Sequence, residues 1–108
     1  MKNSSISHEE IKLARPCIDE PDRYIAESRF SHPFTMDALC SILTKMVEDG
    51  QISDLRCSAK LGVARFEWKE KTILLYRNGR IDIRRAVSVE DAHHIITGLQ
   101  KMIIQAFA

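Results

Sequence analysis

Apolar and polar residues alternate along several stretches of the chain and recur at helical spacing along others. Alternation with a period of two is typical of half-buried strands. Apolar positions three and four apart predict a helix with one buried face. The expected strands are residues 24–30, a short strand within 52–60, 63–69, 72–76 and 81–84, and the expected helices are residues 36–48 and the stretch that follows Ser88.

Short motifs place the ends of these elements. Thr35 is expected to cap the first helix, and Gly50 is placed to end it as a left-handed residue. Asn78-Gly79 lies between two strand-forming runs and predicts a hairpin, because both residues tolerate positive φ. Ser88 is expected to cap the last helix.

The first 22 residues follow neither pattern clearly. Ser7 and Glu10 have the spacing of a capping box, so a short helix is one expectation for this stretch. It would have to stop near Arg15, because a proline follows. We interpret residues 1–22 as an N-terminal arm, laid on the domain or on a partner, and residues 23–108 as a single domain.

The order strand, helix, meandering strands, helix predicts a two-layer α+β domain. Two amphipathic helices pack on one face of a curved antiparallel sheet and leave the other face uncovered. We expect this uncovered face to be close to neutral, because it carries three arginines and three acidic residues, and to be solvated through ion pairs. By alternation it carries Ile25, Glu27, Arg29, Val63, Arg65, Glu67, Thr72, Leu74, Tyr76, Asp82 and Arg84.

Composition is consistent with one globular domain. The chain has 108 residues, of which 44% are hydrophobic and 29% charged, and its formal net charge is +1. These values exclude a disordered chain and a chain with a strong overall positive field. No run of apolar residues is long enough to cross a membrane.

The three cysteines have no CxxC spacing, and the polar N-terminus has no apolar segment typical of a secretory signal. We therefore expect reduced thiols and a cytoplasmic location. Cys40 belongs to the apolar side of the first helix and Cys57 is expected to face inward, whereas Cys17, between prolines, is the thiol expected to be exposed. An intermolecular disulfide is the alternative.

No pattern of catalytic, metal-binding or phosphate-binding residues is present in the sequence. His93 and His94 are adjacent on a helix, so their side chains point about 100° apart and cannot chelate one ion. The acidic pairs lie where helix caps and turns favour acids. We expect no cofactor and no metal, and a protein that is not an enzyme.

From Tyr24 to about Gln105 the chain resembles a single repeat of the TATA-box-binding-protein fold. The resemblance is densest in KTILLYRNGRIDIRRAVSVEDAHHIITGLQKM, residues 71–102, and extends to YIAESRFSHPFTMDAL, where a proline precedes the helix cap. It implies a strand, a helix, curved antiparallel strands and a long helix. Two such repeats form a saddle that binds DNA.

The resemblance also implies where side chains would insert between base steps. Tyr76 falls at the second of the two such positions in a repeat, and Leu61 is the nearest match to the first. Asp82 and Arg84 depart from the family, which has small side chains there. A carboxylate facing the groove would repel phosphates, which puts DNA binding in the family's manner in doubt.

We therefore expect a small binding or assembly module that acts through the uncovered face or a sheet edge. The expected partner is another protein or a second copy of the chain, since a single repeat leaves an exposed strand edge that a homodimer would cover. The alternatives are a nucleic-acid-binding protein and a small enzyme or ligand-binding protein. The residues expected to form the binding face are Arg29, Leu61, Arg65, Leu74, Tyr76 and Arg84.

Overall fold

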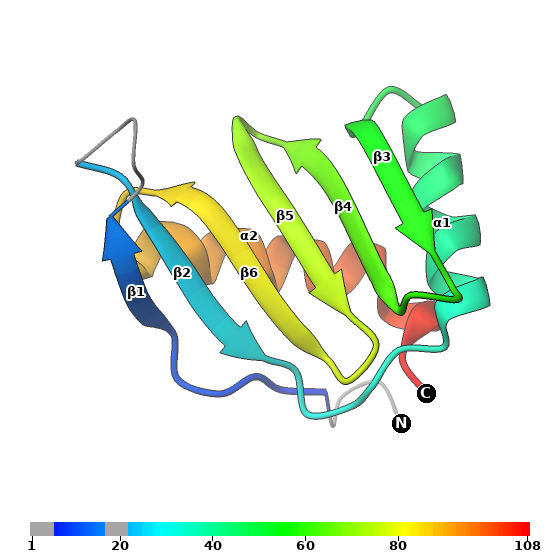
Figure 1. The fold of residues 1–108 in the computed structure, drawn as a ribbon, viewed down its shortest axis with the longest axis horizontal. Coiled ribbons are helices and arrows are strands. Elements are labelled where there is room, and N and C mark those ends of the chain that lie inside the picture. The colour runs from blue at the N-terminus through cyan, green and yellow to red at the C-terminus, as the bar shows by residue number, and fades with distance from the viewer. Residues whose placement is uncertain (1–5, 17–21) are drawn as a thin grey trace.

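The computed structural model describes residues 6–16 and 22–108 of the chain. These residues form a six-stranded antiparallel sheet and two α-helices (Figure 1). The elements are β1 Lys12–Pro16, β2 Tyr24–Arg29, α1 Met36–Glu48, β3 Ser53–Ser58, β4 Val63–Trp68, β5 Lys71–Tyr76, β6 Arg80–Ala86 and α2 Val89–Met102, followed by a 3-10 turn, η2, at Ile104–Ala106.

The sheet order is β1-β2-β6-β5-β4-β3, so the strand that ends the meander returns to lie beside β2. Figure 1 shows α2 crossing behind the sheet, with α1 behind its β3 end. The expected two-layer α+β architecture is confirmed. Register shifts interrupt the pairing of β1 with β2, β2 with β6 and β3 with β4. Such shifts bend strands and increase their twist.

The predicted helices and hairpin are confirmed. The first helix covers Met36–Glu48 with Thr35 at its N-cap position, although the threonine side chain makes no capping hydrogen bond. Gly50 follows with φ of +76°. In the hairpin Gly79 has φ of +96°, and the carbonyl oxygens of Phe30 and His32 pass so close that a side chain there would collide with backbone.

The start of α2 is tied to the sheet by reciprocal capping. The Asp91 backbone N–H donates to the Ser88 hydroxyl at 3.1 Å, and the Val87 N–H donates to the Asp91 carboxylate at 2.8 Å. Lys71 on β5 lies 3.2 Å from the same carboxylate. Burial alone would raise the pKa of Asp91, but the Val87 N–H and the Lys71 ammonium outweigh burial and hold that pKa below its ordinary value.

The core lies between the sheet and the helices. Ile73, Leu75, Ile81 and Ile83 project from the central strands and are fully buried against the apolar faces of the helices. Trp68 packs so closely on Gly98 of α2 that a Cβ there would lie 3.3 Å from its ring. At one end Phe30, Phe34 and Phe107 pack ring against ring, with centroids 4.9–5.9 Å apart.

The short helix expected after Ser7 is wrong. The described part of the arm joins the sheet, because β1 pairs with β2 and His8 forms a bridge with Phe30. Ile11 is buried and Leu13 packs against the core, so burial across strands outweighed the weak local capping signal. With β1 in the sheet, β2 has a neighbour on both sides, and the outer strands among the described residues are β1 and β3.

The expectation that Cys40 and Cys57 are reduced thiols is also wrong. The two cysteines form a disulfide that joins α1 to β3, with their Cα atoms 5.6 Å apart. Both were expected to face the interior, and this shared orientation brings them together. Cys17 lies outside the described residues. No helix among the described ranges is long and apolar enough to cross a membrane.

Candidate binding face of the sheet

The side chains of the sheet that point away from α1 and α2 form what we call the open face. Residues directly opposite each other on neighbouring strands point to the same side of a sheet, so the strand pairing defines the face. Its residues are Lys12, Arg15, Ile25, Glu27, Arg29, Ser53, Arg56, Ser58, Val63, Arg65, Glu67, Thr72, Leu74, Tyr76, Arg80, Asp82 and Arg84.

Five of the residues expected to form the binding face lie on the open face, namely Arg29, Arg65, Leu74, Tyr76 and Arg84. The sixth, Leu61, lies in the turn between β3 and β4. It is 76% exposed and borders a shallow hollow with Tyr76 and Pro33. The structure therefore places all six on one side of the sheet or at its end.

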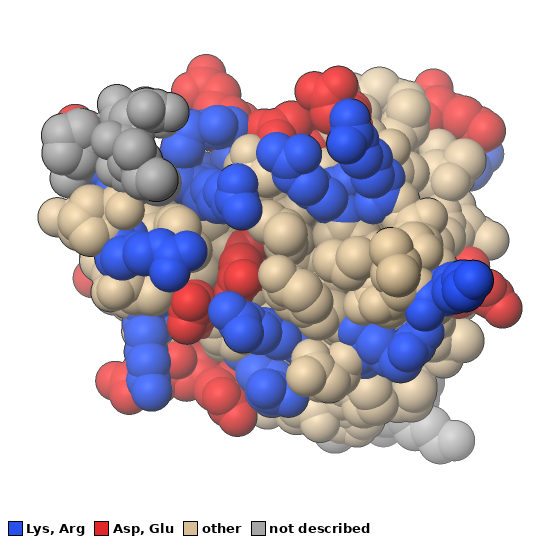
Figure 2. Space-filling view, viewed as in Figure 1, with Lys and Arg blue, Asp and Glu red and all other residues tan. Residues whose placement is uncertain are grey.

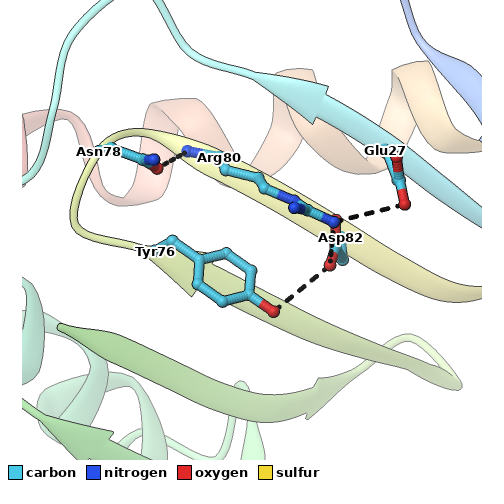
Figure 3. Close-up of polar contacts among 5 residues, drawn as sticks. All are labelled: Glu27, Tyr76, Asn78, Arg80 and Asp82. Atoms are coloured by element: carbon cyan, nitrogen blue, oxygen red, sulfur yellow. Dashed lines mark hydrogen bonds and ion pairs between the residues drawn. The ribbon is translucent and has the colours of Figure 1, made fainter. Parts of the chain in front are cut away.

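A polar network crosses the middle of the open face (Figure 3). Glu27 lies directly opposite Asp82, and Arg80 bridges the two carboxylates. Its guanidinium donates to Asp82 at 3.1 and 3.2 Å and to Glu27 at 3.3 Å. The Tyr76 hydroxyl donates to Asp82 at 3.4 Å, and the Arg80 guanidinium lies 5.4 Å from the centre of the Tyr76 ring. The cost of two facing carboxylates is thus offset inside the chain.

This network shifts the pKa of Tyr76. Burial raises that pKa above the ordinary value of 10.0, the negative charge of Asp82 raises it further, and the charges of Arg80 and Arg84 oppose the rise. Its hydrogen bond to Asp82 also favours the protonated phenol. Tyr76 is therefore a neutral hydrogen-bond donor at physiological pH, and its hydroxyl is directed into the network.

A second polar group on the open face lies where β4 ends, β5 begins and β6 ends. Arg85 follows Arg84 with φ of +67°, a left-handed conformation that turns its side chain toward Glu67, whose carboxylate it contacts at 2.8 Å. Glu67 also accepts a 2.6 Å hydrogen bond from the Thr72 hydroxyl. All three carboxylates of the open face are therefore bonded within the chain.

The open face is not neutral, contrary to our expectation. Its paired strand positions carry seven basic side chains and three carboxylates. The alternation pattern of the sequence did not assign four of these basic residues to the open face. Two of them lie on β1, which was expected to be an arm. Arg56 lies on a short strand for which only the apolar side was considered, and Arg80 was placed in the hairpin turn. Figure 2 shows groups of lysine and arginine side chains, with acidic side chains among them, around a largely uncharged centre over β5 and β4. The four are Lys12, Arg15, Arg56 and Arg80.

Six of these basic residues are exposed, and none of the six forms an ion pair with another residue in the ranges 6–16 and 22–108. Glu9 and Glu10 border a shallow hollow together with Lys12 and Arg29, so the charge is mixed at that end of β2. The excess of positive charge is clearest away from that hollow, on β3, β4 and β6. The six residues are Lys12, Arg15, Arg29, Arg56, Arg65 and Arg84.

A cluster of histidines lies on the other side of the molecule and was not expected from the sequence. The rings of His8 and His93 are 5.5 Å apart between centroids, and His94 follows on α2. These residues border a hollow with Ile11 and Val89. Only the pairing of the N-terminal stretch with β2 brings His8 there. Within the part of the chain that the structure describes, no group of three or more histidine, cysteine or acidic residues is arranged to hold a metal ion.

Comparison with known proteins identifies no relative of this chain. No protein-family model, curated protein or solved structure matches this chain significantly. The resemblance to a TATA-box-binding-protein repeat therefore stays a prediction.

Proposed function

We propose that this protein is a non-enzymatic binding module that uses the open face of its sheet, and that its partner is nucleic acid. The observation that carries the proposal is the seven basic side chains against three carboxylates on that face, with all three carboxylates already bonded within the chain.

Phosphate contacts from lysine and arginine supply most of the affinity in sequence-independent nucleic-acid binding. The exposed Arg65 lies directly opposite Leu74, and both Leu74 and Tyr76 are only partly buried. Bases can pack on partly exposed apolar and aromatic side chains of a sheet while the backbone contacts its arginines. The order strand, helix, strands, helix supports the likeness to a TATA-box-binding-protein repeat, which we also keep as a proposal.

The test is a fluorescence-anisotropy titration of the full chain with labelled single-stranded and duplex DNA at two salt concentrations. We expect binding at low salt that weakens as salt rises. Arg84→Gln should weaken it, whereas Lys101→Gln, which removes an exposed charge from α2, should leave it unchanged. No measurable binding of either DNA at low salt would contradict the proposal.

Self-association is the second candidate, favoured by the edge strands. At the two ends of the sheet, β1 and β3 each pair on one side only among the described strands. Unpaired edges can add a further strand from another chain. A homodimer would therefore form through β1 or β3, or after β1 is displaced from β2.

We also keep the cytoplasmic location as a proposal. The Cys40–Cys57 disulfide weighs against it, because structural disulfides are rare in reducing compartments. Trapping free thiols in protein from the native host by alkylation, followed by mass measurement, decides the question. If the measured mass shows that Cys40 and Cys57 were not alkylated, the result would contradict a reducing location.

A further inference from the structure

Like charges face each other directly across neighbouring strands on the open face. Glu27 lies opposite Asp82 and Arg29 lies opposite Arg80 on β2 and β6, and Arg56 lies opposite Arg65 on β3 and β4. Opposed like charges destabilise a sheet, so each pair needs a counter-charge or has a cost. The pairs differ in where that counter-charge comes from.

The acidic pair is neutralised within the chain. Arg80 contacts Asp82 at 3.1 Å and Glu27 at 3.3 Å. Arg29, which lies opposite Arg80, therefore faces a guanidinium that already has two carboxylate partners. Glu27 and Asp82 therefore need no counter-charge from outside the chain.

The arginine pair, Arg56 and Arg65, has no such partner. Both side chains are exposed, and neither forms an ion pair with a residue in the described ranges. The nearest acidic positions along their strands are Asp54 and Glu67, each two residues away, and Glu67 is already bound by Arg85. Two like charges at opposed positions are thus left without an ion-pair partner among the described residues, beside the outer strand β3.

The surroundings suit an anion that also has an apolar part. On the other neighbour of β4, strand β5, Leu74 lies directly opposite Arg65 and is only half buried. Opposed side chains start from Cβ atoms about 4.5–5.5 Å apart, so both guanidinium groups can reach one small anion. Guanidinium forks bind phosphate oxygens through paired hydrogen bonds.

We infer that Arg56 and Arg65 together bind one phosphate group. A phosphodiester offers two free oxygens, one for each guanidinium, and the sugar and base attached to it can lie toward Leu74. The inference rests on the proposed function when the phosphate belongs to a nucleic-acid backbone. The same chemistry is offered by free phosphate, and the experiment separates the two sources.

The test compares the full chain with the double variant Arg56→Gln/Arg65→Gln. One arm titrates a labelled single-stranded oligothymidylate at several salt concentrations. We expect the variant to bind roughly tenfold more weakly or worse, since each lost hydrogen bond to a charged group has about that effect. Its plot of log affinity against log salt should be less steep by about one. Lys101→Gln should match the wild type.

The second arm measures thermal unfolding in inorganic phosphate and in chloride at equal ionic strength. Phosphate should stabilise the wild type more than the double variant, because a ligand that binds only the folded state adds to the general stabilisation by phosphate. The variant Arg56→Lys/Arg65→Lys keeps both charges without the guanidinium fork and should retain part of both effects.

The outcomes separate the inference from the proposed function. Equal oligothymidylate affinity and salt dependence in wild type and double variant would overturn the arginine-pair site while the binding face stands. Phosphate stabilisation that the double variant loses, without any oligothymidylate binding, supports the site with free phosphate as its ligand and removes the nucleic-acid proposal. Absence of both effects in the wild type overturns both.

Discussion

Single residues on the open face differ mainly in whether their charges already have partners. Asp82 is only 8% exposed and is bonded by Arg80 and Tyr76, so it is unlike a free carboxylate facing a ligand. The expectation that Asp82 would repel phosphates treated it as unpaired. Its charge is balanced where it lies, and this removes the main objection to an anionic partner.

Relief of the arginine repulsion should stabilise the protein. We expect Arg56→Gln to raise the free energy of unfolding by about 0.2–1 kcal/mol at low salt. The gain should shrink in salt, because the Debye length falls from about 30 Å at 0.01 M to about 3 Å at 1 M. Urea unfolding at two salt concentrations measures it, with Lys101→Gln as the control. A loss of stability that salt does not change would show that packing of the Arg56 stem dominates.

The Tyr76 network should make stability depend on alkaline pH. The raised pKa of Tyr76 means that the folded protein holds the phenol proton more tightly than the unfolded chain does. Its contribution is present below pH 10 and is lost as pH rises through the folded pKa. Absorbance titration of tyrosinate should therefore show a late-titrating group that Tyr76→Phe removes, and the fall of unfolding free energy above pH 10 should be smaller in that variant. A titration that the substitution leaves unchanged would contradict this.

At the scale of elements, local signals predicted most of the fold. The helix Met36–Glu48 has the expected bounds, and Ser88 accepts the capping hydrogen bond at the start of α2. The error lies in the stretch that contains β1, where the apolar residues Ile11 and Leu13 are too few to show a period by themselves. Their burial against the core needs β2 beside them, so the strand exists only through a partner distant in the sequence.

The disulfide should hold the edge of the sheet to α1. Cys40 and Cys57 are 17 positions apart. Closing a loop of about 15 residues lowers the conformational entropy of the unfolded chain, which stabilises the folded state by about 3 kcal/mol. We expect Cys40→Ser/Cys57→Ser to lower the free energy of unfolding by roughly 2–4 kcal/mol in denaturant melts. Cys17→Ser is the matched control and should behave as the wild type does. If a reducing agent leaves wild-type stability unchanged, the pair is not bonded in solution.

At the scale of the whole molecule, the open face is more basic than the net charge of the chain suggests. The chain has a net charge of only +1, yet the paired positions of the open face carry seven basic residues and three carboxylates. Three of the other acidic residues, Asp37, Glu90 and Asp91, lie in the first turns of the two helices. A near-neutral protein can therefore present a basic surface, because a net charge says nothing about which face carries which residues.

The assembly state is the prediction that belongs to the whole molecule. We expect a homodimer, formed through the edge of β1 or β3 since β2 is paired on both sides. Light scattering over a concentration series measures the mass directly. A dimer that persists at low micromolar concentration agrees with this expectation, and a monomeric mass at high micromolar concentration contradicts it.

The sequence by itself determined the helices, the hairpin, most strands and which side of those strands faces the core. These features follow from local backbone geometry, since period, caps and turns involve residues within a few positions of each other. Only the tertiary structure decided that β1 joins the sheet, that Cys40 meets Cys57, and that Arg56 faces Arg65 while Arg80 bridges Glu27 and Asp82. Those contacts join residues far apart in the chain, and burial and strand register select them from many arrangements that local patterns allow equally.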